Sequence, residues 1–155
     1  MIIIKKVEMN DIQNLVKFLI KHDLAESINN GTDEYYICKN DDMLCGYGVM
    51  ERHNDFCMIK DVFVSKENRR DKLGSSIVKT MLNSAELSGA ITALCKGNNE
   101  EFSFALNFKP IKAENLPDHI KSFIIEKAKN EKIYFTSLVD YFKNACSSCK
   151  TKLST

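Results

Sequence analysis

The chain has 155 residues, 44% of them apolar and 28% charged, and 22 lysines and arginines nearly balance 21 aspartates and glutamates. This length predicts one soluble globular domain with its own core. The net charge of +1 excludes a bulk electrostatic attraction to nucleic acid or to anionic lipid. The longest apolar runs, 1–4 and 123–125, are too short for a membrane span, and no signal-peptide pattern is present, so we expect a cytoplasmic protein without a membrane partner.

The first third of the chain predicts a strand, a helix and three further strands. Ile2 to Val7 is strand-like, and Asn10 with Gln13 has the spacing of a capping box that opens a helix. An apolar face at helical spacing follows it: Ile12, Leu15, Val16, Leu19 and Ile20. Turn signals then separate three strand-like runs, at 34–39, 43–52 and 56–65, which is typical of an antiparallel meander.

From Leu73 the apolar period changes to that of a helix, and Gly89 is the stop signal. One helical face collects Leu73, Ile77, Val78, Met81, Leu82 and Ala85. The later elements are a buried strand at 90–95, a short helix near 100–106, a strand at 108–111, a helix after Leu116-Pro117 and a strand at 132–138, whose residues also fit a helix with Tyr141 and Phe142. The order of elements predicts an α/β fold with a mixed sheet.

One turn stands out, between the run that ends near Ser65 and the helix that begins at Leu73. Ile59 has one strand parity and Val62 and Val64 have the other, which predicts a bulge in that strand. A basic loop follows it and ends in Gly74 and Ser75, small residues whose N–H groups a ligand can approach at the positive end of a helix. The pattern predicts a cradle for a diphosphate, although a merely charged loop has the same composition.

The turn and the order of elements resemble the GNAT superfamily of acetyl-CoA-dependent N-acetyltransferases. The family's loop, Gln/Arg-x-x-Gly-x-Gly/Ala, is matched by Arg69-Arg70-Asp71-Lys72-Leu73-Gly74, with Lys72 at the middle glycine. A second segment, Phe102-x-x-x-Leu106-Asn107-Phe108, resembles the family's aromatic-x-x-x-Leu-Gly-Phe. Asn107 stands at its glycine, and asparagine is the commonest other residue where φ is positive.

The resemblance implies one GNAT-like domain over 1–155, with 139–155 as a tail or short helix. Its sheet would be mixed and mostly antiparallel, with six to seven strands, helices on both faces and a splayed central pair of strands. Acetyl-CoA would be the acyl-donor cosubstrate. The implied cofactor residues are Val62, Phe63 and Val64, whose main chain would bind the pantetheine arm, and Arg69, Arg70, Lys72, Leu73, Gly74 and Ser75, which would hold the diphosphate.

The resemblance also implies direct attack of a primary amine on the thioester, which needs a proton acceptor and a way to stabilise the thiolate. Asp61 best matches the acidic position on the kinked strand, with Glu51 as a reserve, and a structural carboxylate is the alternative role for Asp61. Ser103 stands where the family often has a tyrosine as general acid. Tyr134 or Tyr141 could supply an acid instead.

The acceptor stays open between a small-molecule amine and an amino acid. Leu116-Pro117, followed by Lys132-Ile-Tyr-Phe, resembles the amino-acid N-acetyltransferases that make N-acetylglutamate, and Cys146-Ser-Ser-Cys149 is similar to the cysteine pair of their short members. A dicarboxylic substrate would need a cationic partner. Its candidates here are Lys60, His119 and Lys121; the other histidines, His22 and His53, are expected at the surface.

Two further alternatives remain open. A degenerate GNAT-like domain could bind acyl-CoA as a sensor or interaction module, as Ser103 and the missing middle glycine suggest. Cys146 and Cys149 supply two of the four ligands of a structural zinc site, so a metal or redox role competes with a plain reduced tail. We expect no resident metal, and a homodimer is compatible with the sequence. Four cysteines lie in strand-like apolar runs and are expected in the core: Cys38, Cys45, Cys57 and Cys95.

Overall fold

The computed structural model describes residues 1–24, 32–96, 106–127 and 132–143. Its strands are β1 (Ile2–Lys6), β2 (Asp33–Asn40), β3 (Met43–Arg52), β4 (Phe56–Val64), β5 (Thr92–Lys96), β6 (Lys109–Pro110) and β7 (Ile133–Ser137). Its α-helices include α1 (Ile12–Lys21), α2 (Leu73–Leu87) and α4 (Asp118–Lys127), and its 3-10 helices include η1 (Met9–Asp11), η3 (Lys66–Asp71) and η4 (Ala113–Asn115). The strand order is β1-β2-β3-β4-β5-β7-β6. The sheet is mixed and mostly antiparallel, which confirms the predicted α/β fold.

The chain forms two compact units. Unit 1 consists of residues 1–52 and 59–85, and unit 2 of residues 53–58 and the chain from 86 onward. Strand β4 contributes to both units, because its first residues belong to unit 2 and its remaining residues to unit 1. The single domain expected from the sequence stays a prediction.

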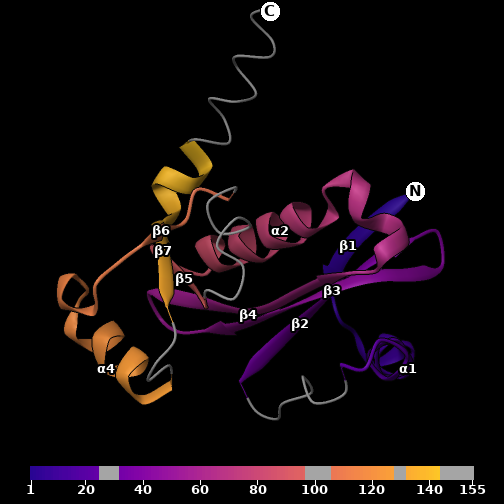
Figure 1. The fold of residues 1–155 in the computed structure, drawn as a ribbon, viewed down its shortest axis with the longest axis horizontal. Helices are drawn as coiled ribbons and strands as arrows, with labels where there is room; N and C mark the ends of the chain where they lie inside the picture. The colour runs from indigo at the N-terminus through magenta and orange to yellow at the C-terminus, as the bar shows by residue number, and fades with distance from the viewer. Residues whose placement is uncertain (25–31, 97–105, 128–131, 144–155) are drawn as a thin grey trace, which may run out of the picture. The chain divides into compact units, whose positions relative to one another are not determined.

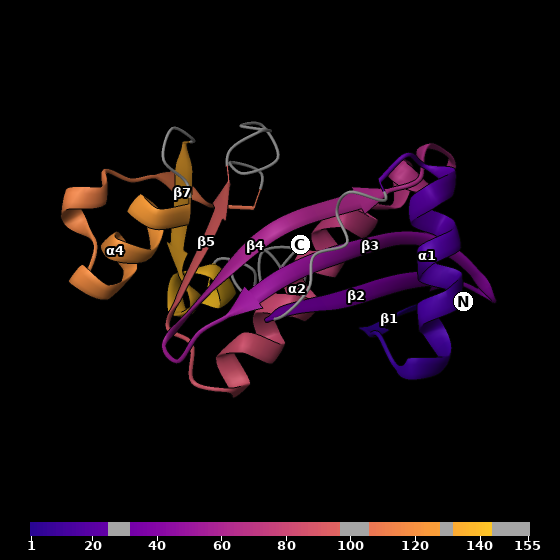
Figure 2. The same ribbon diagram turned by 90° about the horizontal axis from the view of Figure 1, so that it is seen from below.

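Unit 1 is a sheet with a helix on each face. Strands β1, β2 and β3 pair antiparallel, with Ile4 opposite Cys38 and Ile37 opposite Tyr47. Helices α1 and α2 cover opposite faces of these strands (Figures 1 and 2). The core on the α1 side contains Leu15, Phe18, Leu19, Ile37, Tyr47 and Val49, with Phe63 packed against it.

Helix α2 buries the face that its apolar period predicts. Leu73, Ile77, Val78, Met81, Leu82 and Ala85 are all buried. Gly89 follows the helix with a φ of +104°, a conformation that glycine adopts without strain, so the predicted stop signal is confirmed.

Unit 2 pairs β5 with β7 (Figure 2) and β7 with β6, all antiparallel. Helix α4 begins directly after Leu116-Pro117, as expected, and covers one core of this unit. That core contains Phe56, Met58, Leu94, Leu116, Ile120, Ile124 and Ile133. Residues 138–143 are helical, so the segment first predicted as a strand ends at Ser137 and continues as a helix, the alternative left open above.

The predicted capping box was wrong. Glu8 and Asp11 form it instead, two residues earlier than Asn10 and Gln13, and the Asp11 carboxylate accepts the Glu8 N–H at 3.0 Å. Asp11 forms the capping box because its carboxylate also binds Lys39 and Lys5, and the local spacing of residues does not reveal these two contacts. The predicted strand at 108–111 is shorter, Lys109–Pro110, and the predicted helix near 100–106 lies almost wholly outside the described residues. Within the described ranges, no helix has both the length and the apolar character that a membrane span requires.

Candidate cofactor and catalytic site

The turn after β4 is built from short local bonds. Ser65 N–H binds the carbonyl of Cys45 at 2.8 Å, which ties the end of β4 to the start of β3. Asn68 then closes η3 back onto Ser65, because its N–H binds the Ser65 carbonyl at 2.9 Å and its amide donates to Ser65 Oγ at 2.7 Å. The loop therefore leaves the strand in a fixed direction.

Arg69 connects this loop to the strand that precedes it. Its Nε donates to the carbonyl of Val64 at 2.9 Å, and its guanidinium carbon lies 5.6 Å from the centre of the Phe63 ring. The predicted diphosphate ligand Arg69 thus touches two of the predicted pantetheine residues. Its side chain holds strand and loop together, while Lys66 and Lys72 are exposed cations of the same loop.

Lys72 occupies a left-handed backbone conformation, with φ +54° and ψ +33°. It stands where the GNAT loop has its middle glycine, and this conformation is the one that glycine adopts at least cost. The first α-helical backbone bond runs from Ser76 N–H to the Lys72 carbonyl at 3.2 Å. The N–H groups of the residues before Ser76 therefore open the helix without helical partners, as a diphosphate cradle requires.

Two glycines bring α2 close to β3. A Cβ at Gly48 would lie 2.6 Å from Ile77 Cγ2 and 2.9 Å from Met81 Cε, and one at Gly46 would lie 2.7 Å from the Phe63 carbonyl oxygen. Gly48 therefore permits the close packing of β3 against the helix whose first turn forms the cradle, and Gly46 permits the close approach of β3 to the Phe63 carbonyl of β4. The sequence analysis did not use them, although a glycine inside a strand signals a close backbone approach.

Asp61, the predicted proton acceptor, is half-buried on β4 and accepts a hydrogen bond from the phenol of Tyr47 on β3 at 2.5 Å. Its neighbour Lys60 contacts both carboxylate oxygens of Asp33 on β2 at 3.1 Å. Asp33 and Tyr47 belong to the same face of the β2–β3 pair, since Asp33 has the parity of Ile37, the partner of Tyr47.

Consecutive residues of a regular strand point to opposite faces. Lys60 and Asp61 nevertheless reach side chains on one face, so the contacts support the break in strand alternation predicted between Ile59 and Val62. Glu51, the reserve carboxylate, is buried directly opposite Asp33, and Thr32 donates to it at 3.4 Å. The face therefore carries the carboxylates of Asp33, Glu51 and Asp61.

Of the cations considered for a dicarboxylic substrate, two are bound to carboxylates. Lys60 binds Asp33 in unit 1. His119 binds Asp55 in unit 2 through Nε2, at 2.8 and 3.0 Å to its two oxygens, while Lys121 is half-buried on α4. Neither Lys60 nor His119 is thus available without displacing an acidic partner.

The tyrosines named as alternative acids lie in unit 2 and are buried: Tyr134 is 1% exposed and Tyr141 is 6% exposed. Burial raises the pKa of Tyr141 to about 12, so this phenol holds its proton more tightly than a solvated tyrosine. This makes Tyr141 a poor proton donor to a thiolate.

Asn107 has a φ of +64°, which confirms the positive value expected where the GNAT segment has glycine. The two histidines expected at the surface are half-buried, which was not predicted. His22 packs with its ring centre 4.5 Å from that of Phe18, and His53 stacks on Phe56 at 4.3 Å.

Several predicted residues lie outside the described ranges: Phe102, Ser103, Cys146 and Cys149. The side chain of Arg70 is not described either. Among the described residues, no group of three histidines, cysteines or acids could hold a metal ion. Cys38, Cys45, Cys57 and Cys95 are buried thiols, which confirms their place in the core.

Comparisons with solved structures show the same fold in known acetyltransferases. N-acetylglutamate synthase from Neisseria gonorrhoeae, solved with coenzyme A and N-acetyl-glutamate, aligns with a TM-score of 0.69 at 16% identity, over 89% of this chain and 35% of the synthase. This chain therefore spans about a third of that enzyme's length. A GNAT-family acetyltransferase from Staphylococcus aureus Mu50 aligns with a TM-score of 0.67 at 15% identity, over 89% of this chain and 99% of that one.

The ribosomal-protein-S18-alanine N-acetyltransferase from Escherichia coli aligns with a TM-score of 0.63 at 12% identity, over 89% of this chain and 94% of that enzyme. A search among curated proteins finds no significant match. The family model described as an acetyltransferase (GNAT) domain matches residues 3–129, which is most of the chain. The chain therefore belongs to the GNAT acetyltransferase family.

Proposed function

We propose that the chain is an N-acetyltransferase that transfers the acetyl group of acetyl-CoA to a primary amine of a small molecule or amino acid. The observation that carries the proposal is the loop from β4 to α2. It holds a left-handed residue where the family has glycine, followed by a helix start whose N–H groups are available to a diphosphate. The Arg69 side chain links this loop to β4, because it donates a hydrogen bond to the carbonyl of Val64, the last residue of the strand proposed to bind pantetheine.

Acetyl-CoA supplies a thioester: the amine nitrogen forms the new carbon–nitrogen bond, the carbon–sulfur bond breaks, and coenzyme A leaves with the bonding electrons as its thiolate. The residues of this chain bind the cosubstrate, orient its thioester and accept a proton from the amine. The N–H groups of Lys72, Leu73, Gly74 and Ser75 hold the diphosphate, and the main chain of Val62 to Val64 aligns the arm. Asp61 accepts the proton that the attacking nitrogen loses.

The acceptor is proposed at the level of a primary amine, without restriction to glutamate. Lys60 and His119 are bound to Asp33 and Asp55, so two of the three side chains considered for recognising a second carboxylate already contact an acidic residue. The similarity to N-acetylglutamate synthase supports the fold and leaves the acceptor to experiment. Cytoplasmic localisation and a homodimer stay predictions from the sequence.

Binding is tested first, by calorimetry and by thermal shift with acetyl-CoA. We expect Gly74→Trp to abolish binding, because the indole would fill the approach to the first turn of α2. Lys79→Trp, on the exposed side of the same helix, is the matched control and should bind as the unsubstituted chain does. Equal affinity of the Gly74→Trp variant would remove the cradle assignment.

Turnover is tested by the release of free thiol from acetyl-CoA with a panel of amino acids, polyamines, aminoglycosides and peptide N-termini. We expect one class of amine to raise thiol release above the rate of acetyl-CoA hydrolysis, and Asp61→Asn to reduce this rate by about 100-fold. Binding of acetyl-CoA without thiol release for any amine would favour the acyl-CoA-binding sensor over the enzyme.

A further inference from the structure

Tyr47 is a completely buried tyrosine whose phenol is directed at the proposed proton acceptor. Its exposed fraction is 0%, and its hydroxyl donates to Asp61 Oδ2 at 2.5 Å. The two residues lie on neighbouring strands, β3 and β4, and are 14 positions apart in the chain. A local sequence pattern therefore does not reveal the pair.

Aromatic neighbours fix the Tyr47 ring. The ring of Phe18 on α1 meets it nearly edge-on, with centres 6.5 Å apart, and the Phe63 ring lies 6.2 Å away. Phe63 is two residues after Asp61 on β4, so the strand that carries the carboxylate also packs against the tyrosine that binds it. A ring held in this way presents its hydroxyl in one direction, without the cost of ordering a mobile side chain during the reaction.

A neutral hydroxyl such as that of Tyr47 is a suitable hydrogen-bond donor to a carboxylate that has to accept a proton. A neutral hydroxyl orients a carboxylate and stabilises its charged form, yet it leaves the net negative charge in place. The neighbouring ammonium, Lys60, contacts both oxygens of Asp33 at 3.1 Å. Because of the break in strand alternation, Lys60 and Asp61 both reach this face of the sheet. Lys60 binds Asp33 there, and Asp61 accepts the hydrogen bond of Tyr47.

We propose that Tyr47 is a positioning residue for acetyl transfer, holding the Asp61 carboxylate in the orientation that accepts the proton of the acceptor amine. The inference rests on the proposed function. The proton moves from the attacking nitrogen to a carboxylate oxygen of Asp61, while Tyr47 keeps its own proton throughout. Tyr47 does not touch the substrate and acts through Asp61.

The test compares Tyr47→Phe with Tyr36→Phe in the thiol-release assay. Tyr36 is a second buried tyrosine of the same sheet, on β2, so its variant controls for the loss of one buried hydroxyl. We expect Tyr47→Phe to lower kcat by about 10- to 100-fold with the KM for acetyl-CoA within about twofold. The Tyr36→Phe variant should keep its kcat within about twofold of the unsubstituted chain.

The pH profile separates positioning from a structural role. Loss of a hydrogen bond donated to a carboxylate destabilises the charged form, so the low-pH limb of kcat should move to higher pH by about one unit in Tyr47→Phe. In an Asp61→Asn background, Tyr47→Phe should change kcat by less than about twofold, because the group through which it acts is gone.

An unchanged kcat would overturn the role of Tyr47, and so would an unmoved low-pH limb of kcat or fully multiplicative effects in the double variant. Those results leave the acetyltransferase activity standing, since the unsubstituted chain still releases thiol. If the unsubstituted chain binds acetyl-CoA but releases no thiol with any amine, the proposed function fails and the role of Tyr47 fails with it.

Discussion

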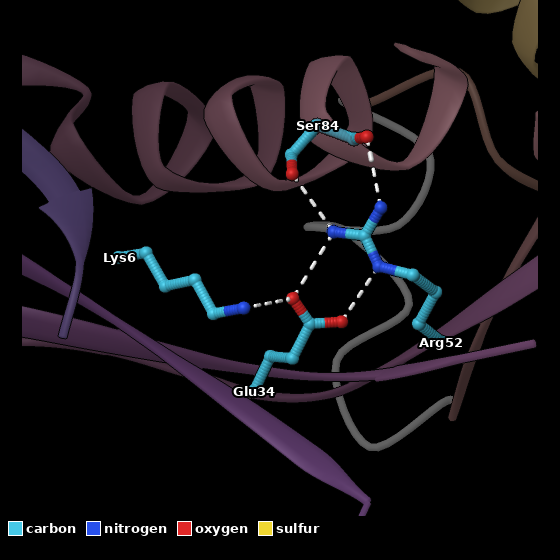
Figure 3. Close-up of polar contacts among 4 residues, drawn as sticks. All are labelled: Lys6, Glu34, Arg52 and Ser84. Atoms are coloured by element: carbon cyan, nitrogen blue, oxygen red, sulfur yellow. Dashed lines mark hydrogen bonds and ion pairs between the residues drawn. The ribbon is translucent and has the colours of Figure 1, made fainter. Parts of the chain in front are cut away.

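The guanidinium of Arg52 binds both carboxylate oxygens of Glu34, with Nε to Oε2 at 2.6 Å and Nη2 to Oε1 at 3.1 Å (Figure 3). The same guanidinium donates to the Ser84 carbonyl at 2.9 Å and to Ser84 Oγ at 2.8 Å, and Lys6 adds a second cation to Glu34 at 2.9 Å. Burial raises the pKa of Glu34, but the hydrogen bonds from Arg52 and Lys6 outweigh it and lower this pKa below its usual value. The network joins β1, β2, β3 and α2.

Arg52→Met should lower the free energy of unfolding by about 2 to 3 kcal/mol, because it removes both guanidinium bonds to the mostly buried Glu34 carboxylate and the bonds to Ser84. Lys6→Met is the matched control: its side chain is 60% exposed, so its loss should cost less than about 1 kcal/mol. Urea unfolding measures both. Equal losses for the two variants would contradict the central place of Arg52 in the network.

Lys72→Gly should raise the free energy of unfolding by about 1 kcal/mol, because glycine adopts the left-handed conformation of this position without a Cβ penalty. Lys72→Val should lower it, since a β-branched residue tolerates a positive φ worst. Both variants keep the N–H group of the cradle. Thermal unfolding checks this prediction, and a Lys72→Val variant as stable as the unsubstituted chain would contradict it.

Gly48→Ala should lower the free energy of unfolding by about 1 to 3 kcal/mol, since the new Cβ would overlap Ile77 and Met81 on α2. Adding Ile77→Ala removes the Cγ2 atom in closest contact. We therefore expect the double variant to be less destabilised than the sum of the two single changes. Simple additivity in urea unfolding would show that the backbone moves instead.

Stability at acid pH should depend on Asp11. The hydrogen bond from the Glu8 N–H, followed by those from Lys39 and Lys5, lowers the pKa of Asp11 to about 2 against burial, from an ordinary value of 3.8. A lowered folded-state pKa contributes stability that is present above about pH 4 and lost as the pH falls through about 2. Urea unfolding between pH 2 and 6 should show this loss in the unsubstituted chain and a weaker one in Asp11→Asn.

The control for this measurement is Asp41→Asn, which removes a carboxylate whose side chain is 83% exposed. It should keep the pH dependence of the unsubstituted chain. If Asp11→Asn and Asp41→Asn give the same curves, the buried network around Asp11 does not carry the acid sensitivity.

The Cys38 thiol should resist alkylation in the folded protein. Burial is the main cause that raises the pKa of Cys38 to about 12, and the neighbouring Cys45 thiol, whose sulfur lies 3.2 Å away, adds to it. The thiolate is the reactive form, so iodoacetamide at pH 8 should label Cys38 at least about 100-fold more slowly in the folded state than in urea. Peptide mass spectrometry reads the site, and similar rates in the two states would contradict the prediction.

Several elements could be predicted because their signals are local. The apolar period after Leu73 identified every buried position of α2, and Leu116-Pro117 marked the start of α4. Asn107 indicated a positive φ by its residue type alone. Each of these signals depends on neighbours within a few positions of the chain.

Other features could not be predicted, because they depend on contacts between distant segments. The capping box involves Asp11 and not Asn10, because the Asp11 carboxylate also binds Lys39, which is 28 positions away in the chain. His22 looked like a polar helix end, yet it packs against Phe63 on β4, with ring centres 5.1 Å apart. The sequence left Lys60 as a candidate partner for a substrate carboxylate, but in the fold Lys60 binds Asp33.

The sequence by itself determined the α/β class, the order of elements and the loop with a helix start at Leu73, because period, turn residues and motif spacing are properties of adjacent residues. Only the tertiary structure decided which charges are paired and which side chain faces Asp61. Register and strand alternation, set by packing across the sheet, place Tyr47 against Asp61 and Lys60 against Asp33. Some of the charges that nearly balance in the composition thus form specific pairs, while Lys66, Arg69 and Lys72, whose side chains the structure describes as exposed, lie before the first turn of α2.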